Sequence, residues 1–221
     1  MYTYKRTITS GDMIEVEYYQ SIRKIGKNYG GRKSNNSLSS AKMRKANKLR
    51  AVKHMQRLIN ANFGSGDFFC RFSAPYGTYE TEEEFRKEVG KWLDRINYRL
   101  KKQGKGRLKY IAFIECGKSG KNWHIHIIVS KEDRELLSEQ WPYQNGQNFT
   151  PLYKNENFKK LAEYITKDLT GKEDVDAAQK RMMTSRNLTK PESVTRKAKR
   201  KEIRALERHQ HLLYRSNLLL C

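Results

Sequence analysis

Residues 67–153 carry the pattern that most constrains the fold of this chain, because segments of strand and helix type follow one another there in a clear order. Runs of β-type apolar residues bounded by turn residues predict strands, and apolar residues at helical spacing predict helices. The segments are a strand at 67–73, a helix from 81 to about 100, strands at 109–116 and 123–129, a short helix at about 131–141 and a strand within 148–153. This β-α-β-β-α-β order predicts an α+β fold of the ferredoxin-like type, an antiparallel sheet with helices packed on one face.

Two of these segments carry additional local signals. Thr81 and Glu84 form a capping box at the start of a helix whose apolar residues recur as far as Leu100. Turn residues at 117–121 separate the two apolar strands that surround them, which predicts a β-hairpin. A further helix is predicted over about 156–169.

The segments outside this pattern divide the rest of the chain. Residues 2–20 predict a hairpin, 26–40 a flexible basic loop and 41–61 a basic helix with apolar positions. Residues 190–208 are strongly basic and have helical character. The predicted organisation is an N-terminal hairpin, loop and helix in 1–62, a central domain in 63–190 and a basic helical tail in 191–221.

The charge of the chain points to a polyanionic partner. Its 46 Lys and Arg against 24 Asp and Glu give a formal net charge of +22. The basic clusters at 42–57 and 190–208 are either solvated helix faces or contacts for phosphate, and the excess of one sign favours phosphate. No apolar run reaches the roughly 20 residues that cross a bilayer. The three cysteines form no CxxC pair, so we expect a cytoplasmic protein in a reducing compartment.

His124-Ile125-His126 is the sharpest chemical feature. In a strand, residues two apart point to the same side, so both imidazoles leave one face together. If the hairpin turns symmetrically about Ser119-Gly120, Glu115 lies opposite His124 and Phe113 lies opposite His126, all on that face. Two imidazoles and one carboxylate suit Mn²⁺, Mg²⁺ with retained waters, or Zn²⁺, and leave coordination positions open. A bulge in the hairpin would shift this register and remove the site.

A second pair, His209-Gln210-His211, lies in a segment that reads as helix. Residues two apart on a helix diverge by roughly 200°, and no acidic residue is near. We therefore expect no metal at this second pair.

Tyr164 is the tyrosine whose surroundings suggest chemistry. It lies beside the apolar stripe of the helix at 156–169, and Lys160 and Lys167 are within one turn of it. Ammonium groups so placed could stabilise a phenolate nucleophile. The residue could equally be a half-buried packing residue, and both readings stay open from the local sequence alone.

The order of these features resembles that of HUH endonucleases. Glu115, the strand with His124-Ile125-His126 and the helix with Tyr164-Ile165-Thr166-Lys167 are most similar to the single-tyrosine rolling-circle replication initiators of bacterial plasmids and phages. The resemblance covers about residues 60–191. The first motif of that family corresponds to the strand Phe68–Ser73, where Cys70-Arg71-Phe72-Ser73 departs from the hydroxyl and apolar residues often found there.

The resemblance implies a catalytic domain in 63–190 and a set of site residues. His124 and His126 would bind a divalent metal, Mg²⁺ or Mn²⁺, with Glu115 as the third ligand. Tyr164 would attack the scissile phosphate and Lys167 would assist it, giving a 5′-phosphotyrosyl bond and a free 3′-OH. Single-stranded origin DNA would be the substrate, and a host helicase is a further candidate partner.

Other functions remain open at this level. A two-tyrosine enzyme would carry a second tyrosine four residues after Tyr164, where this chain has Asp168. A non-catalytic RNA- or DNA-binding protein could use the same ferredoxin-like sheet, although such sheets present exposed aromatic residues on their central strands. An HUH transposase or mobilisation nuclease would use the same chemistry in another context.

Overall fold

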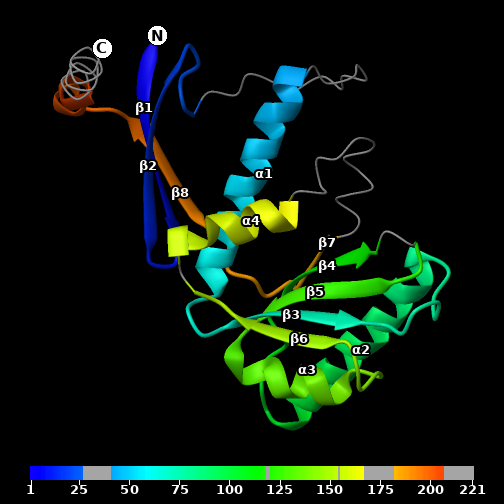
Figure 1. Ribbon diagram of the computed structural model, residues 1–221. Helices are drawn as coiled ribbons and strands as arrows, with labels where there is room; N and C mark the ends of the chain where they lie inside the picture. The colour runs from blue at the N-terminus through cyan, green and yellow to red at the C-terminus, as the bar shows by residue number, and fades with distance from the viewer. Residues whose placement is uncertain (27–40, 118–119, 154, 167–181, 207–221) are drawn as a thin grey trace. The chain divides into compact units, whose positions relative to one another are not determined.

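The computed structural model describes residues 1–26, 41–117, 120–153, 155–166 and 182–206 (Figure 1). Its chain divides into two compact units, residues 1–38 with 191–221 and residues 39–190. The protein is a mixed α+β structure with antiparallel sheets. No helix within the described ranges is long and apolar enough to cross a membrane.

The unit of residues 39–190 is built on a five-stranded sheet in which every strand pair is antiparallel. The strands are β3 (Phe68–Ser73), β4 (Ile111–Cys116), β5 (Trp123–Val129), β6 (Gln147–Pro151) and β7 (Met182–Thr184). Their order across the sheet is β6-β3-β5-β4-β7 (Figure 1). The predicted strands and the predicted hairpin are therefore confirmed.

The helices of this unit are α1 (Ala41–Asn62), α2 (Glu82–Lys102), α3 (Arg134–Gln140) and α4 (Lys159–Thr166), with short 3₁₀ turns η1 (Lys131–Asp133) and η2 (Asn155–Phe158). The cap predicted for α2 is present, since the Thr81 hydroxyl accepts from the Glu84 N–H at 3.2 Å. The Glu84 carboxylate reaches one residue further back and accepts from the Glu80 N–H at 3.0 Å. The sequence thus sets the start of α2 as expected.

One face of the sheet packs against α2 and α3 and holds the larger core. Trp92 of α2 is fully buried, and its indole N–H donates to the Leu137 carbonyl of α3 at 3.2 Å. Truncation of such a residue typically costs about 3–5 kcal/mol. The alternate residues of the strands that enter this core are Cys70, Phe72, Ala112, Ile114, Ile125, Ile127 and Val129.

The opposite face is also covered, by α1 and α4, and this corrects the prediction of helices on one face only (Figure 1). Ile111, Phe113 and Ile128 point to this second face and are buried. Side chains so apolar need a cover, and the residues that supply it are Val52, Met55, Leu58, Ile59 and Phe63 of α1 with Ala162 and Ile165 of α4. The uncovered part of this face holds the candidate site.

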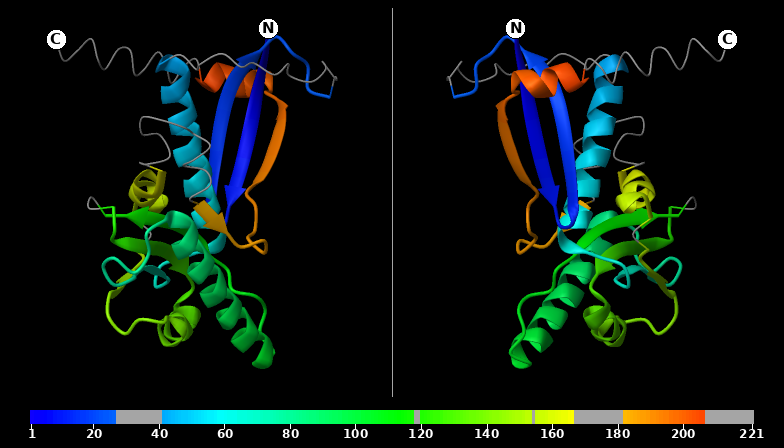
Figure 2. Two further views of the ribbon diagram at one scale, coloured as in Figure 1. Left: turned by 90° about the vertical axis from the view of Figure 1, so that its right-hand side faces the viewer. Right: turned by 90° about the vertical axis from the view of Figure 1, so that its left-hand side faces the viewer.

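The unit of residues 1–38 and 191–221 contains a three-stranded sheet in the order β2-β1-β8 (Figure 2). β1 (Tyr2–Ser10) and β2 (Met13–Ser21) form the predicted hairpin, and β8 (Glu192–Lys197) pairs with β1. Gly11 has φ of 57°, which a two-residue hairpin turn requires and glycine adopts readily.

This sheet corrects the predicted helical tail. Residues 192–197 form a strand, and helix begins only at residue 200 in the described part of the tail. Glu202 fixes the junction, because its carboxylate accepts from Lys5 at 3.1 Å and from Arg196 at 2.6 and 2.8 Å. The units also cut the chain differently from the predicted segments 1–62, 63–190 and 191–221, since α1 belongs with the five-stranded sheet.

Candidate metal centre and active site

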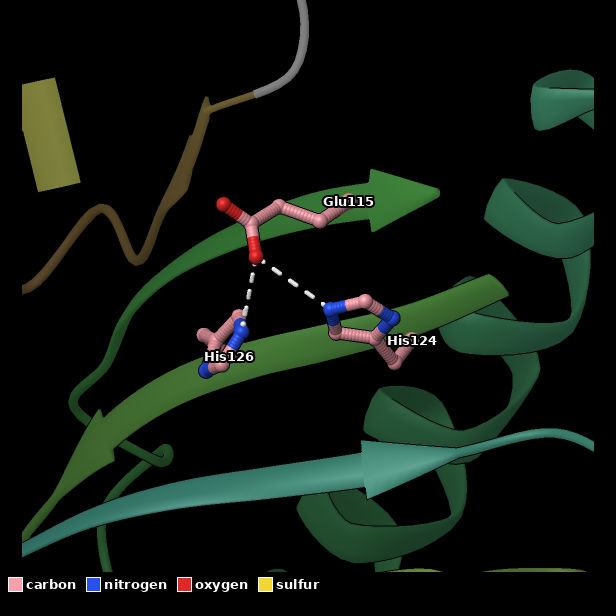
Figure 3. Close-up of side chains that lie close together, drawn as sticks. All are labelled: Glu115, His124 and His126. Atoms are coloured by element: carbon pink, nitrogen blue, oxygen red, sulfur yellow. Dashed lines mark hydrogen bonds and ion pairs between the residues drawn. The ribbon is translucent and has the colours of Figure 1, made fainter. Parts of the chain in front are cut away.

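The hairpin of β4 and β5 has the register that the sequence predicts. Glu115 pairs with His124 and Phe113 pairs with His126 in an antiparallel ladder without a bulge. All four side chains therefore leave the face of the sheet that α1 and α4 partly cover. Figure 3 shows Glu115 reaching from β4 toward the two imidazoles on β5.

The three polar side chains converge on one point. The Glu115 Oε2 lies 2.9 Å from the His126 Nε2 and 3.2 Å from the His124 Nε2 (Figure 3). One ligand atom from each of the three residues lies within 4.8 Å of the other two. Both imidazoles are buried, and Glu115 is half-buried. One ion could reach all three ligand atoms without a large movement of the backbone.

The tautomer of His124 supports a cation at this point. Its Nδ1 lies 3.1 Å from the carbonyl oxygen of Asn122, which can only accept, so the Nδ1–H is the donor. A neutral His124 then has a lone pair on Nε2 that faces a carboxylate oxygen at 3.2 Å. Two electron-rich atoms at that distance repel unless a proton or a metal ion lies between them. A backbone acceptor on the far ring nitrogen is also the usual support of a metal-binding histidine.

His126 is held between two aromatic rings. Its imidazole stacks on Phe113 at 4.8 Å and on Phe69 at 5.2 Å between ring centroids. Burial lowers the pKa of His126, and the hydrogen bond and charge of Glu115 only partly counteract this effect. The neutral ring, which is the form that binds metals, is therefore favoured at neutral pH. The stack also fixes the ring plane, so Nε2 stays directed at Glu115.

Tyr164 of α4 lies against the same cluster. Its ring meets His126 edge-on at 5.8 Å, and it also lies 6.0 Å from Phe69 and 6.1 Å from Phe113 between centroids. The side chain is 36% exposed, so solvent or a ligand can reach it. A chain separation of 38 residues between His126 and Tyr164 is thus closed by the packing of α4 on the sheet.

The start of α4 is anchored to α1. The carbonyl oxygen of Asn157 accepts from the Asn60 side-chain amide at 2.8 Å and from that of Gln56 at 3.1 Å. Asn157 and Phe158 have φ of 50° and 59°, a left-handed conformation that costs roughly 1–2 kcal/mol per residue. The two hydrogen bonds and the burial of Phe158 hold this turn in place and so fix where Tyr164 lies.

The structure brings together four of the residues singled out from the sequence: Glu115, His124, His126 and Tyr164. Lys167, His209 and His211 lie outside the described residues. Two contributions were missed. Phe69 stacks on His126, and Arg71 lies beside His126 on the adjacent strand. The alternation of β3, with Cys70 and Phe72 in the core, is the signal that places Phe69 and Arg71 on the site face.

Comparison with known proteins adds one finding. Residues 77–173 match a family model of replication-associated proteins, the ORF2 family. The chain is therefore similar to a replication initiator. The matched segment contains the whole of β4 and β5 and the described part of α4, so it includes the three converging side chains and Tyr164. No curated protein and no solved structure gave a significant match.

Proposed function

We propose that this protein is a rolling-circle replication initiator of the HUH endonuclease type. It would nick and rejoin single-stranded DNA at an origin through a covalent 5′-phosphotyrosine on Tyr164. The observation that carries the proposal is the contact of Tyr164 with His126, a member of a Glu-His-His cluster, inside the segment similar to replication-associated proteins. DNA replication is the role that the family similarity supports.

The sheet is compatible with a ferredoxin-like core of the HUH type. Its elements β3-α2-β4-β5-α3-β6 have the predicted β-α-β-β-α-β order, and the strands lie in the order β6-β3-β5-β4. In this arrangement β5 and β3 are interior strands, and the His pair lies near the middle of the sheet. We assign α1 and α4 as the additional helices that close the second face around the site.

Glu115, His124 and His126 would hold a divalent ion, Mg²⁺ or Mn²⁺. When bound there, such an ion would stabilise the negative charge that develops on a phosphodiester during displacement. The donor set fits this role, because one carboxylate and two neutral imidazoles leave coordination positions for phosphate oxygens and water. The lone pair that His124 directs at Glu115 is the structural feature that such an ion would satisfy.

The residues of the chain would perform the transesterification themselves. The Tyr164 hydroxyl loses its proton and forms a bond to phosphorus, while the bond from phosphorus to the 3′ oxygen breaks. The 3′ oxygen takes up a proton and leaves as a free 3′-OH. One phosphodiester replaces another, so the reverse attack by a 3′-OH rejoins the strand and restores Tyr164. Lys167 is proposed to stabilise the phenolate.

The charge distribution supports a DNA substrate. α1 exposes several basic side chains, namely Lys45, Lys48, Arg50 and Lys53. Together with the net charge of +22 they favour a polyanion. The sequence shows no helicase motif, so we propose that a separate host helicase supplies unwinding at the origin. Such a protein would work in the cytoplasm.

The test is covalent capture. The protein is incubated with Mn²⁺ and a random-sequence pool of end-labelled single-stranded oligonucleotides, then resolved under denaturing conditions. We expect a labelled protein adduct that EDTA prevents. Tyr164→Phe should abolish the adduct and Tyr153→Phe, which removes an exposed hydroxyl elsewhere, should leave it unchanged. An adduct that persists in Tyr164→Phe, or its absence from the wild type, would refute the proposal.

A further inference from the structure

Arg71 lies in a row of residues that crosses the sheet through the candidate site. In the paired register, Phe113 on β4 is followed by His126 on β5, Arg71 on β3 and Asn148 on β6. Neighbouring strands are about 4.8 Å apart, so Arg71 lies one strand away from His126. Figure 3 shows β3 running alongside β5 next to the His pair.

Arg71 points to the same face as the His pair. Its neighbours Cys70 and Phe72 are fully buried in the core under α2 and α3, and the next residue on the Arg71 side, Phe69, stacks on His126. Since side chains alternate along a strand, Arg71 leaves the sheet between Phe69 and Ser73, on the face of the site.

The guanidinium group has no partner of opposite charge among the described residues. Arg71 is half-buried, and its Nε is buried without a hydrogen-bond acceptor in this part of the chain. A buried donor left unsatisfied costs about 1–3 kcal/mol, so such a group is usually retained for a ligand or a water. Glu115, the nearest acid described in the site, is directed at the two imidazoles instead.

The charges around this donor favour a phosphate as that ligand. The site contains one carboxylate, one guanidinium and a neutral His126, and a divalent ion would make the sum clearly positive. A guanidinium offers parallel N–H groups that match two oxygens of a phosphate, which an ammonium group does not.

We propose that Arg71 binds the phosphate that Tyr164 attacks, through the non-bridging oxygens of that phosphate. Arg71 would hold the phosphate from the side of β3, and Tyr164 would approach from α4. This inference rests on the proposed function for the identity of the phosphate. Arg71 would orient the group and stabilise its charge during displacement, and it distinguishes this chain from relatives with hydroxyl or apolar residues in the same strand.

The test separates binding from catalysis. Affinity for a 12-nucleotide random single-stranded DNA is measured in EDTA over a range of salt for the wild type, Arg71→Gln, Arg71→Lys and Arg134→Gln. Arg134 is the matched control, because it lies over Phe68 and Phe149 against the other face of the sheet. The rate of adduct formation with Mn²⁺ is then measured for each variant. Thermal melting with and without Mn²⁺ checks that each variant folds and keeps its metal response.

We expect Arg71→Gln to weaken binding about tenfold or more and to reduce the slope of log affinity against log salt by about 0.7, which is one phosphate contact. Arg134→Gln should keep the slope. Arg71→Lys should keep most of the binding but slow adduct formation at least tenfold, because it lacks the two parallel donors. Wild-type affinity and slope in a folded Arg71→Gln would overturn the inference. A wild type without adduct, combined with the expected binding losses, would refute only the proposed nicking function.

Discussion

Divalent metal should stabilise the unit of residues 39–190 against heat. Three ligand atoms already lie within 4.8 Å of one another, so binding needs little rearrangement and should favour the folded state. At a free Mn²⁺ concentration 100 times the dissociation constant, the gain is about 2.7 kcal/mol. For a unit of about 150 residues, each kcal/mol raises the melting temperature by about 2–4 °C. The expected shift is therefore roughly 5–11 °C.

The assay is calorimetry or dye-based melting of metal-stripped protein titrated with MnCl₂. Glu115→Gln, His124→Ala and His126→Ala should each lose most of the shift. His54→Ala is the control, because His54 is exposed on α1 and its loss should leave the shift intact. A shift of similar size in all four variants, or no shift in the wild type at millimolar Mn²⁺, would refute a metal site built from these three residues.

Three further predictions concern other parts of the chain. Burial raises the pKa of the Cys70 thiol to about 12, so mass spectrometry should find it alkylated by iodoacetamide at pH 8 far more slowly than the half-buried Cys116; equal rates would contradict this. Arg196 and the Lys199 N–H hold the pKa of Glu202 well below its usual range, so its stabilising effect is full above about pH 5 and falls in acid. Melting curves of Glu202→Gln and the wild type should then differ at pH 7 and converge toward pH 2. Single-stranded DNA binding should show a log–log salt slope of roughly −3 to −4 if about five phosphates are contacted, and a slope near zero would exclude an electrostatic interface.

The hairpin that carries the metal ligands could be predicted because its determinants are local. Apolar alternation sets which residues share a face, and the turn at 117–121 sets which residues face each other. Glu115 and His124 are only nine residues apart, so a symmetric turn was enough to pair them. The capping box of α2 is local in the same sense.

The features that were not predicted depend on contacts between distant segments. The strand at 192–197 pairs with β1 across more than 180 residues, and its few β-type residues, Val194 and Thr195, stand in a strongly basic stretch. The position of α4 depends on the apolar cover that α1 provides and on the left-handed turn at Asn157, neither of which follows from helical periodicity. The contact between Tyr164 and His126 therefore needed the structure.

The identity of the tyrosine that carries DNA tests the central proposal most directly. The Mn²⁺-dependent adduct is digested with nuclease and protease, and the peptides are searched by mass spectrometry for a tyrosine bearing a 5′-linked deoxynucleotide. The account predicts the modification on Tyr164 alone. Modification of another tyrosine, such as the exposed Tyr153, or an adduct that contains no phosphotyrosine would contradict it.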